Sequence, residues 1–398
     1  MEKTTTQNRF ISDLQPAVLA LANGAIFTGI AIGASGQAIG EVVFNTSMTG
    51  YQEILTDPSY AEQIVTLTYP HIGNVGINRH DAESNRVWVK GLIIRELSLT
   101  VSNWRSQQSL VEYLIKHNIV AIADIDTRRL TRLLRTEGSQ AGCILTGNEN
   151  SKIALQAARS FSGIKGKNLT QEVTNLASEN WEESVHHFES SKSFLSSSSA
   201  LPFSAENTPC HVVVYNFGVK QQILRLLKSL GCQVTVVPAT TSTPEILALK
   251  PHGILLSNGP GDPEACDDAI KNIQSLFDTN IPIFGICLGF QLLALAYGAK
   301  TQKMKFGHHG ANHPVQDIED KSVSITSQNH SFCVLEENLP TELTVTHRSL
   351  FDGSLQGFRH RSQPVFAFQG HPEASPGPND INGLFKQFYE WMKKHANA

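Results

Sequence analysis

From residue 211 onward, short apolar runs alternate with amphipathic stretches. The runs at 211–215, 233–237 and 253–257 have the length and composition of β-strands, and the stretches 220–230 and 244–249 between them have helical periodicity. This alternation predicts a parallel sheet with helices on both faces, which is a doubly wound α/β fold. Ligands bind such folds at the carboxyl ends of the strands.

The start of the chain has a different pattern. Two apolar runs, 17–22 and 25–32, are separated by Asn23-Gly24. Together they are almost long enough to cross a membrane. A central Asn-Gly instead favours a β-hairpin with a type I′ turn, and the run before the turn is too short for a signal peptide. We therefore expect two paired strands and no membrane segment.

The rest of this first part is strand-rich up to residue 147, with helices predicted at 106–117 and 127–136. The second helix carries Arg128, Arg132 and Arg135 on one face and leucines on the other. That arginine face is either solvated or a docking surface for a partner protein. The first part is expected to be a strand-rich α+β domain.

The length of 398 residues fits two domains better than a single core. Residues between the two patterns become polar and end in a serine run at 196–199, which places a boundary near residue 205. The expected divisions are a loose N-terminal extension at 1–15, a first domain at 16–150, a connection at 151–209 and a second domain at 210–398.

Composition and charge narrow the class of protein. A hydrophobic content of 40% with 17% charged residues is typical of a soluble globular chain. The net charge of −4, with scattered lysines and arginines, argues against nucleic-acid binding. Six cysteines without a Cys-x-x-Cys pair indicate a reducing compartment, so we expect a cytoplasmic protein.

The most informative stretch is 281–293, an apolar strand that runs into a helix with Cys287 at the turn. This pattern predicts a nucleophile elbow with sulfur in place of a hydroxyl. Gly285 and Gly289 flank the cysteine, where side chains would collide with a strained turn. The helix from about Leu288 directs its N-terminal N–H groups at the sulfur, which favours a thiolate. The alternative is a buried free cysteine without a catalytic role.

A candidate base lies near the C-terminus, in Gly370-His371-Pro372-Glu373. In extended backbone, His371 and Glu373 point to the same side, so the carboxylate can orient the imidazole. Pro372 stiffens the pair. A structural turn is the alternative. The catalytic hypothesis requires the Cys287 sulfur to be reachable by solvent and within bonding distance of His371.

These motifs resemble those of a known family. The segments 257–263, 285–291 and 370–374 resemble the signatures of class I (triad) glutamine amidotransferases, a resemblance that extends over about residues 210–395. The first part resembles the N-terminal domain of carbamoyl-phosphate synthase small chains. The segments that carry this second resemblance are 40–53, 56–60, 68–76 and 124–128.

The resemblance implies a glutaminase subunit with Cys287, His371 and Glu373 as catalytic residues. Glutamine would be hydrolysed through a thioester, and the ammonia would pass to a large synthetase subunit that makes carbamoyl phosphate from bicarbonate and ATP. The chain has no phosphate-binding glycine loop of its own. We therefore expect no cofactor in this chain, with ATP and its metal ions on the partner. Whether the product enters pyrimidine or arginine synthesis is left open.

The same resemblance implies a set of glutamine-binding positions. They are Ser59, Gly259, Gly261, Leu288, Gln291, Asn329, Ser331 and Phe332. The backbone N–H groups of Leu288 and Gly259 are also expected to hold the oxyanion. Three positions depart from the family pattern, namely Ser331 in place of glycine, Phe290 in place of histidine and Asn216 in place of aspartate.

Other interpretations of the sequence remain. His308, His309 and His313 could suggest a metal, but no supporting cysteine or carboxylate is near them, so no metal is expected. The chain could instead supply ammonia to another synthetase, be a regulatory subunit with a vestigial site, or be a cysteine hydrolase or protease. Glutamate release from glutamine distinguishes these possibilities.

Overall fold

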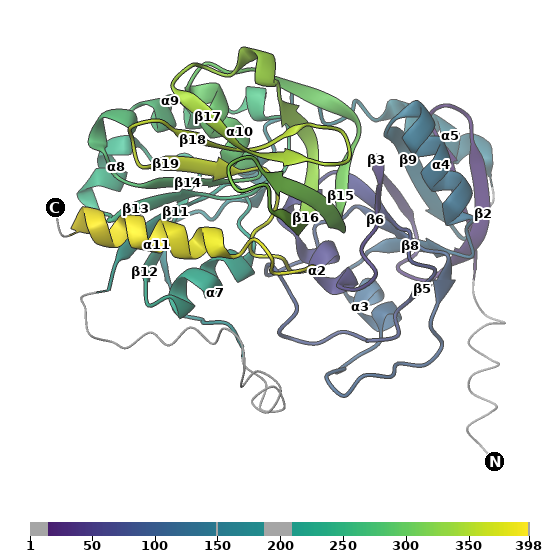
Figure 1. Ribbon diagram of the computed structural model, residues 1–398. Helices are drawn as coiled ribbons and strands as arrows, with labels where there is room; N and C mark the ends of the chain where they lie inside the picture. Colours follow the sequence, from purple (N-terminus) through teal and green to yellow (C-terminus); the bar gives the residue numbers. More distant parts are fainter. Residues whose placement is uncertain (1–14, 149, 187–208, 397–398) are drawn as a thin grey trace. The chain divides into compact units, whose positions relative to one another are not determined.

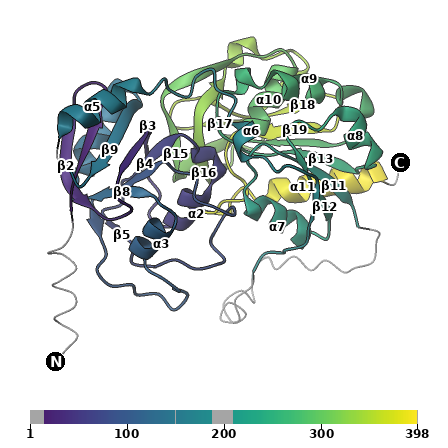
Figure 2. The same cartoon turned by 180° about the vertical axis from the view of Figure 1, so that it is seen from behind.

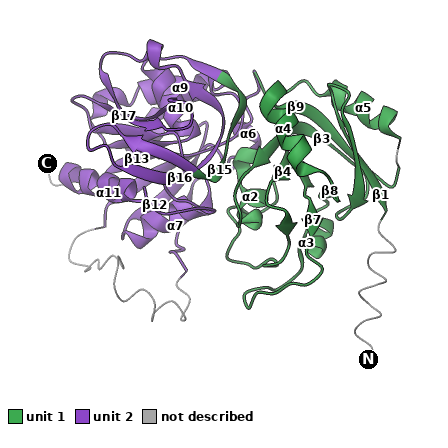
Figure 3. Cartoon of the chain, turned by 45° about the vertical axis from the view of Figure 1, so that its right-hand side comes forward, with its two compact units in different colours: residues 1–165, 303–312 green, residues 166–302, 313–398 purple. Residues whose placement is uncertain are grey.

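The computed structural model describes residues 15–148, 150–186 and 209–396 (Figure 1). The chain divides into two compact units (Figure 3). Unit 1 contains residues 1–165 and 303–312, and unit 2 contains residues 166–302 and 313–398. Residues 1–14 of the extension expected at 1–15, the serine run and the boundary near 205 lie outside the described residues.

Unit 1 is built around a closed barrel with the strand order β1-β2-β8-β6-β4-β3-β9. Its strands are β1 (Pro16–Leu21), β2 (Ile26–Ala31), β3 (Gln37–Asn45), β4 (Gln63–Leu67), β6 (Gly91–Ile93), β8 (Val120–Ala123) and β9 (Gln140–Thr146). The neighbours β3, β4, β6 and β8 run parallel, whereas β1 and β9 pair antiparallel. A separate two-stranded sheet joins β5 (His71–Ile72) and β7 (Glu96–Leu97).

The predicted hairpin of β1 and β2 is present, but its turn differs from the prediction. The N–H of Gly24 donates to the carbonyl of Leu21 at 2.8 Å, so Ala22 and Asn23 are the central residues of the turn. Gly24 alone adopts a positive φ, of 99°, and Asn23 does not. The type I′ prediction is therefore wrong, because the loop is longer and Asn23 uses its side-chain oxygen to accept the N–H of Ala25 at 3.0 Å.

Short helices cover the barrel. They are α2 (Tyr51–Thr56), η1 (Pro58–Tyr60), α3 (Leu110–Lys116), α4 (Thr127–Glu137) and α5 (Ser151–Ser160). The helix predicted from residue 106 begins at Leu110, because Ser109 and Glu112 form a capping box there. In α4, Leu130 and Leu134 are buried, as the leucine face predicted.

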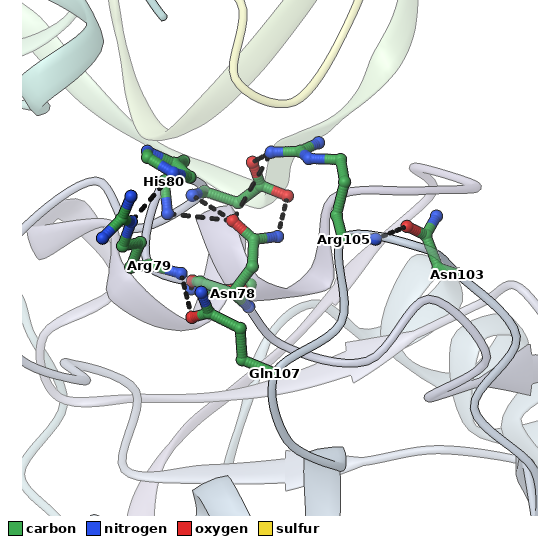
Figure 4. A network of polar contacts seen from close by, with 8 residues as sticks. Asn78, Arg79, His80, Asn103, Arg105 and Gln107 are labelled. Atoms are coloured by element: carbon green, nitrogen blue, oxygen red, sulfur yellow. Dashed lines mark hydrogen bonds and ion pairs between the residues drawn. The ribbon is translucent and has the colours of Figure 1, made fainter. Parts of the chain in front are cut away.

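The long loops of unit 1 are fixed by polar contacts (Figure 4). Asn78 is central, because its side chain donates to Asp81 at 2.7 Å and its carbonyl accepts Gln52 at 2.5 Å. Arg105 forms an ion pair with Asp81. Gln107 accepts the N–H of Arg79 at 3.1 Å. Two loops distant in sequence are thereby held beside helix α2.

A ten-stranded sheet has the order β10-β12-β11-β13-β14-β19-β18-β17-β15-β16 and belongs to unit 2, except for residues 303–312 of β15, which belong to unit 1. The strands are β10 (Glu179–Trp181), β11 (His211–Asn216), β12 (Gln233–Pro238), β13 (Gly253–Leu256), β14 (Ile283–Ile286), β15 (Thr301–Asp317), β16 (Val323–Val334), β17 (Leu343–Ser349), β18 (Leu355–His360) and β19 (Val365–Phe368). The five central strands from β12 to β19 are parallel, and β18 and β17 continue the sheet antiparallel.

Helices lie on both faces of this sheet, as the alternation predicted (Figures 1 and 2). One face packs an apolar cluster against α8 (Thr243–Ala248), α9 (Asp267–Gln274) and α10 (Leu288–Ala296). The other packs a second cluster against α7 (Gln221–Ser229) and α11 (Gly383–Ala396). The α/β class with a strand-rich first part is confirmed.

The stretch expected to connect the two halves contains regular structure. Helix α5 belongs to unit 1, while α6 (Thr170–Val173) and β10 belong to unit 2, where β10 pairs with β12. The polar composition after residue 150 did not reveal this. Across the described ranges, no helix has the length and apolar character needed to span a membrane.

Candidate active site

Cys287 lies between strand β14 and helix α10, with φ 54° and ψ −102°. This conformation is strained for a residue with a side chain. Its flanking glycines are required by space. A Cβ on Gly285 would lie 2.7 Å from the Gly289 oxygen, and a Cβ on Gly289 would lie 2.1 Å from the Leu256 oxygen. The tight turn between strand and helix therefore depends on both glycines.

The thiol of Cys287 is held by the sheet. The backbone N–H of Cys287 donates to the Phe368 carbonyl at 3.0 Å, and the thiol Sγ donates to the Asn329 carbonyl at 3.4 Å. The residue is only 2% exposed. The expectation of a solvent-reachable sulfur is therefore wrong for this conformation, because Cys287 lies in an apolar cluster with Phe368 and the Asn329 backbone contacts its sulfur.

The imidazole of His371 is placed just beyond strand β19. The backbone N–H of His371 donates to the Ser327 carbonyl at 2.8 Å, and the ring Nδ1 lies 2.7 Å from Glu373 Oε1. Both side chains are buried, with 1% and 0% of their surfaces exposed. The contact between Nδ1 and the carboxylate directs Nε2 away from Glu373, as the spacing of the two residues predicted.

A residue that the sequence analysis missed completes this group. Lys220 is 2% exposed, and its Nζ lies 2.9 Å from Glu373 Oε1 and 2.5 Å from the Ala374 carbonyl. It precedes helix α7, and its N–H donates to Asn258 Oδ1 at 3.1 Å. No spacing in the sequence connects Lys220 with Glu373, so only the fold reveals the pair.

These charges shift two pKa values in opposite directions. For Glu373, burial acts to raise the pKa, but Lys220 and His371 together lower it to about 2. For His371, burial acts to lower the pKa, but the negative charge of Glu373 and the neighbouring Cys287 outweigh burial and raise it to about 10. At neutral pH the pair is therefore a carboxylate and an imidazolium.

Cys287 and His371 are neighbours without a well-formed hydrogen bond. Cys287 lies close enough to His371 to raise its pKa. His371 Nε2 nevertheless has no hydrogen-bond partner of normal geometry among the described residues. The Cys287 sulfur instead donates to the Asn329 carbonyl. Catalytic hydrogen bonds often tighten only when substrate binds.

The loop after β13 supplies two of the predicted glycines. A Cβ on Gly259 would lie 2.1 Å from the Phe217 oxygen and 3.0 Å from Leu288 Cδ2. Gly261 has a φ of 98°, and a Cβ there would lie 2.8 Å from the Lys167 oxygen. Gly259 and Leu288 are thus brought together, and no side chain other than hydrogen fits at either glycine.

Four more predicted positions gather near the cysteine in unit 2. Gln291 donates from Nε2 to the Phe332 carbonyl at 2.8 Å and to Gln369 Oε1 at 3.0 Å. Asn329 accepts the Cys287 thiol through its carbonyl. Ser331 has a buried hydroxyl without a hydrogen-bond partner among the described residues. This hydroxyl is available to a ligand.

Ser59 belongs to unit 1, where it lies in η1 and its N–H donates to Asp57 Oδ1 at 2.9 Å. The role of Ser59 in glutamine binding stays a prediction. The histidines considered for a metal are divided, with His308 and His309 in unit 1 and His313 in unit 2. Among the described residues, no group of three potential ligands is placed to hold a metal ion.

Two of the departures from the family pattern have clear structural settings. Asn216 Oδ1 accepts the N–H groups of Gly218 and Val219 at 3.0 and 2.9 Å, a role that an aspartate could also fill. Phe290 is fully buried, with its ring 5.0 Å from that of Phe358. Phe290 therefore belongs to the core.

Comparisons with known proteins cover nearly the whole chain. The family model for class I glutamine amidotransferases matches residues 212–391, and that for the CPSase domain of the carbamoyl-phosphate synthase small chain matches residues 19–144. A carbamoyl phosphate synthase small chain from Pseudomonas aeruginosa is 61% identical over 95% of this chain and 98% of its own length. The protein of that name from Pseudomonas syringae is 58% identical over 96% and 99%, and that from Salmonella typhimurium 56% over 97% and 99%.

These matches span both halves, which argues against a subunit that shares only the amidotransferase half. The chain belongs to the family of carbamoyl-phosphate synthase small chains, the glutamine-hydrolysing amidotransferase subunits.

Proposed function

We propose that Cys287, His371 and Glu373 are the catalytic triad with which this chain hydrolyses L-glutamine to glutamate and ammonia. The geometry that carries this proposal is the strained turn at Cys287 beside a buried His371-Glu373 pair. In this reading the turn is a nucleophile elbow, because it presents a side chain between a strand end and a helix N-terminus. The divisions 16–150 and 210–398 are proposed as its two functional domains.

The protonation states support a covalent mechanism. In the proposed reacting state a Cys287 thiolate faces a His371 imidazolium, and the raised pKa of His371, about 10, favours the protonated ring. The thiolate attacks the side-chain amide carbon of glutamine and forms a tetrahedral oxyanion. The imidazolium then protonates the amide nitrogen, the C–N bond breaks, and ammonia leaves a glutamyl thioester. Water, activated by the now neutral His371, hydrolyses the thioester to glutamate and restores the thiolate.

The backbone N–H groups of Leu288 and Gly259 are proposed to hold the oxyanion. Leu288 is the first residue of α10, and the close packing of Gly259 against Leu288 keeps that loop near the helix start. The helix N-terminus adds a partial positive charge at this position.

Glutamine itself is proposed to contact Ser59, Gly261, Gln291, Asn329, Ser331 and Phe332 in addition to the oxyanion donors. The orphaned hydroxyl of Ser331 supports this assignment. The Cys287 sulfur is in contact with the Asn329 carbonyl. Glutamine must therefore displace this contact when it binds.

The ammonia is proposed to pass to the large synthetase subunit in a heterodimeric, cytoplasmic complex, with ATP and its metal ions bound by that partner. Ammonia released into water would protonate and be lost to the synthesis, so direct transfer is required.

Substitution of the nucleophile tests the proposal. Cys287→Ser should lower glutamine hydrolysis by roughly four orders of magnitude, while the complex with the synthetase should still make carbamoyl phosphate from added ammonia. Glutamine hydrolysis at the wild-type rate by this variant would refute the assignment of Cys287. Loss of both activities would instead indicate structural collapse, which a circular dichroism melt would reveal.

A further inference from the structure

A cleft of about 790 Å³ lies in unit 1 where three parallel strands end. Thr68 directly follows β4, Arg95 lies just beyond β6, and α4 begins shortly after β8. These three strands are neighbours in the barrel. The carboxyl ends of parallel strands, next to a helix N-terminus, are common binding positions for anions.

The lining of this cleft is strongly basic. Four arginines, Arg95, Arg128, Arg132 and Arg135, face one carboxylate, Asp126. They give the lining a formal charge of +3, on a chain whose net charge is −4. Asp126 is already engaged, because its Oδ1 accepts the backbone N–H of the helix at 2.9 Å.

The arginines on α4 have no acidic partner within the part of the chain that the structure describes. Arg128, Arg132 and Arg135 make no ion pair or side-chain hydrogen bond there. Arg95 reaches Asp124 at 3.7 Å, but both side chains are at least half exposed. An exposed pair of this kind neutralises little charge.

This arrangement is unfavourable for the helix alone. Arg128 lies in the first turn of α4, where the helix dipole favours negative charge, and the N-cap Asp126 supplies the one carboxylate described at this helix start. Arg128 and Arg132 are four residues apart and Arg132 and Arg135 three apart, so like charges adjoin on one face. Anionic groups bound in the cleft would relieve both effects.

The dimensions favour an extended anion. Arg128 and Arg135 lie seven positions apart, or about 10 Å along the helix axis, which exceeds the reach of one carboxylate or phosphate. Their side chains are exposed, whereas small-molecule sites bury most of the ligand. Between them, Thr131 Oγ1 is buried without a hydrogen-bond partner among the described residues and can donate to an additional acceptor.

We propose that this arginine cleft (Arg95, Arg128, Arg132 and Arg135) docks an acidic segment of the synthetase subunit. The inference rests on the proposed function, which requires a second subunit to receive the ammonia. Guanidinium groups pair with carboxylates through two parallel hydrogen bonds, so a row of them recognises successive acidic side chains. The cleft thereby contributes affinity and orientation to the complex.

The test compares two variants of the full chain. Arg132→Gln/Arg135→Gln removes two charges from the cleft, and Arg129→Gln is the control, because Arg129 lies on the same helix but stacks on Phe27 at 4.8 Å and does not line the cleft. Each variant is mixed with the purified synthetase subunit, and the dissociation constant is measured at low and high salt. Glutamine hydrolysis by each isolated chain is measured in parallel.

We expect the double variant to bind the synthetase about tenfold more weakly at low salt, with a smaller difference at high salt. The control should bind like the wild type, and all chains should hydrolyse glutamine alike. Equal affinity of the double variant and the wild type at both salt concentrations would overturn the docking proposal, as would a wild-type chain that hydrolyses glutamine but does not bind the synthetase.

Inorganic pyrophosphate, titrated into the isolated chain, provides a second readout. Binding that the double variant loses, combined with unchanged synthetase affinity, would identify a small-anion site and overturn docking. Absence of glutamine hydrolysis in every chain would refute the proposed function. The affinity measurement tests docking alone, so the two failures are distinguishable.

Discussion

The glycine after the catalytic candidate offers a steric test of the site. In Gly289→Ala, the new Cβ would lie 2.1 Å from the Leu256 oxygen and 2.6 Å from its carbonyl carbon. Both atoms belong to the backbone of β13, a fully buried central strand that cannot move aside like a side chain. The start of α10 must therefore retreat from the sheet.

The size of that retreat follows from the distances. Contacts of a Cβ closer than 3.0 Å essentially do not occur, so the helix start must move by about 0.9 Å or more. Overpacking of this kind costs about 1–3 kcal/mol of folding free energy. Displacement of reacting groups by about 1 Å can cost roughly a hundredfold in rate. Because Gly289 lies two residues after Cys287, we expect glutamine hydrolysis to fall roughly a hundredfold, a rise in the activation barrier of about 2.7 kcal/mol that is comparable with the loss of folding free energy.

Steady-state glutamate release and urea unfolding measure the two effects. Gly383→Ala is the matched control, because a Cβ at that helical position meets no atom within 4 Å. The control should keep wild-type hydrolysis and gain slightly in stability. Wild-type hydrolysis by Gly289→Ala would refute the reasoning that close packing of α10 against β13 positions the nucleophile.

Three further substitutions test the surroundings of the triad. Gly259→Ala should lower glutamine hydrolysis at least tenfold but preserve ammonia-dependent synthesis, because its Cβ would lie 2.1 Å from a backbone oxygen; equal loss of both activities would contradict a local effect. Lys220→Met should destabilise the chain by about 3 kcal/mol in urea unfolding, since it leaves the buried Glu373 carboxylate without its lysine, whereas the exposed pair of Lys228 should make Lys228→Met nearly neutral. The stability loss in Glu373→Gln should be greatest between pH 4.5 and 6.5. It should shrink as pH rises from 6.5 toward about 10, where His371 deprotonates in the folded state, and as pH falls from 4.5 toward about 2, where Glu373 protonates; a loss independent of pH would exclude this coupling.

The sequence predicted elements well where the signal is local. The alternation from residue 211 identified the sheet and its two helical layers, because each buried strand is short and each helix has one apolar face. The sequence predicted the hairpin near Asn23 but not its turn type. The turn also includes Ala22, which lies outside the Asn23-Gly24 motif. Strand β10 was missed because three residues at a sheet edge carry almost no apolar signal.

The chemistry of the site was predictable only in part. Each motif around Cys287 and His371 is contiguous in sequence, so its internal geometry could be inferred. Lys220 could not, because its contact with Glu373 joins residues 153 positions apart. The burial of the sulfur was also missed, because it results from the Asn329 backbone of another strand.

The proximity of the two motifs follows from one strand pairing. Strands β14 and β19 are parallel neighbours in which Ile286 is paired with Phe368. Cys287 therefore leaves the sheet at the edge where the chain continues from Phe368 to His371, and the hydrogen bond from the Cys287 N–H to the Phe368 carbonyl fixes their relative positions. Periodicity predicts that both segments are strands but not that they are neighbours. The proximity of Cys287 and His371 was instead predicted from chemistry, because a thiol nucleophile requires a nearby base. The pairing of β14 with β19 is the structural reason that the two residues are close.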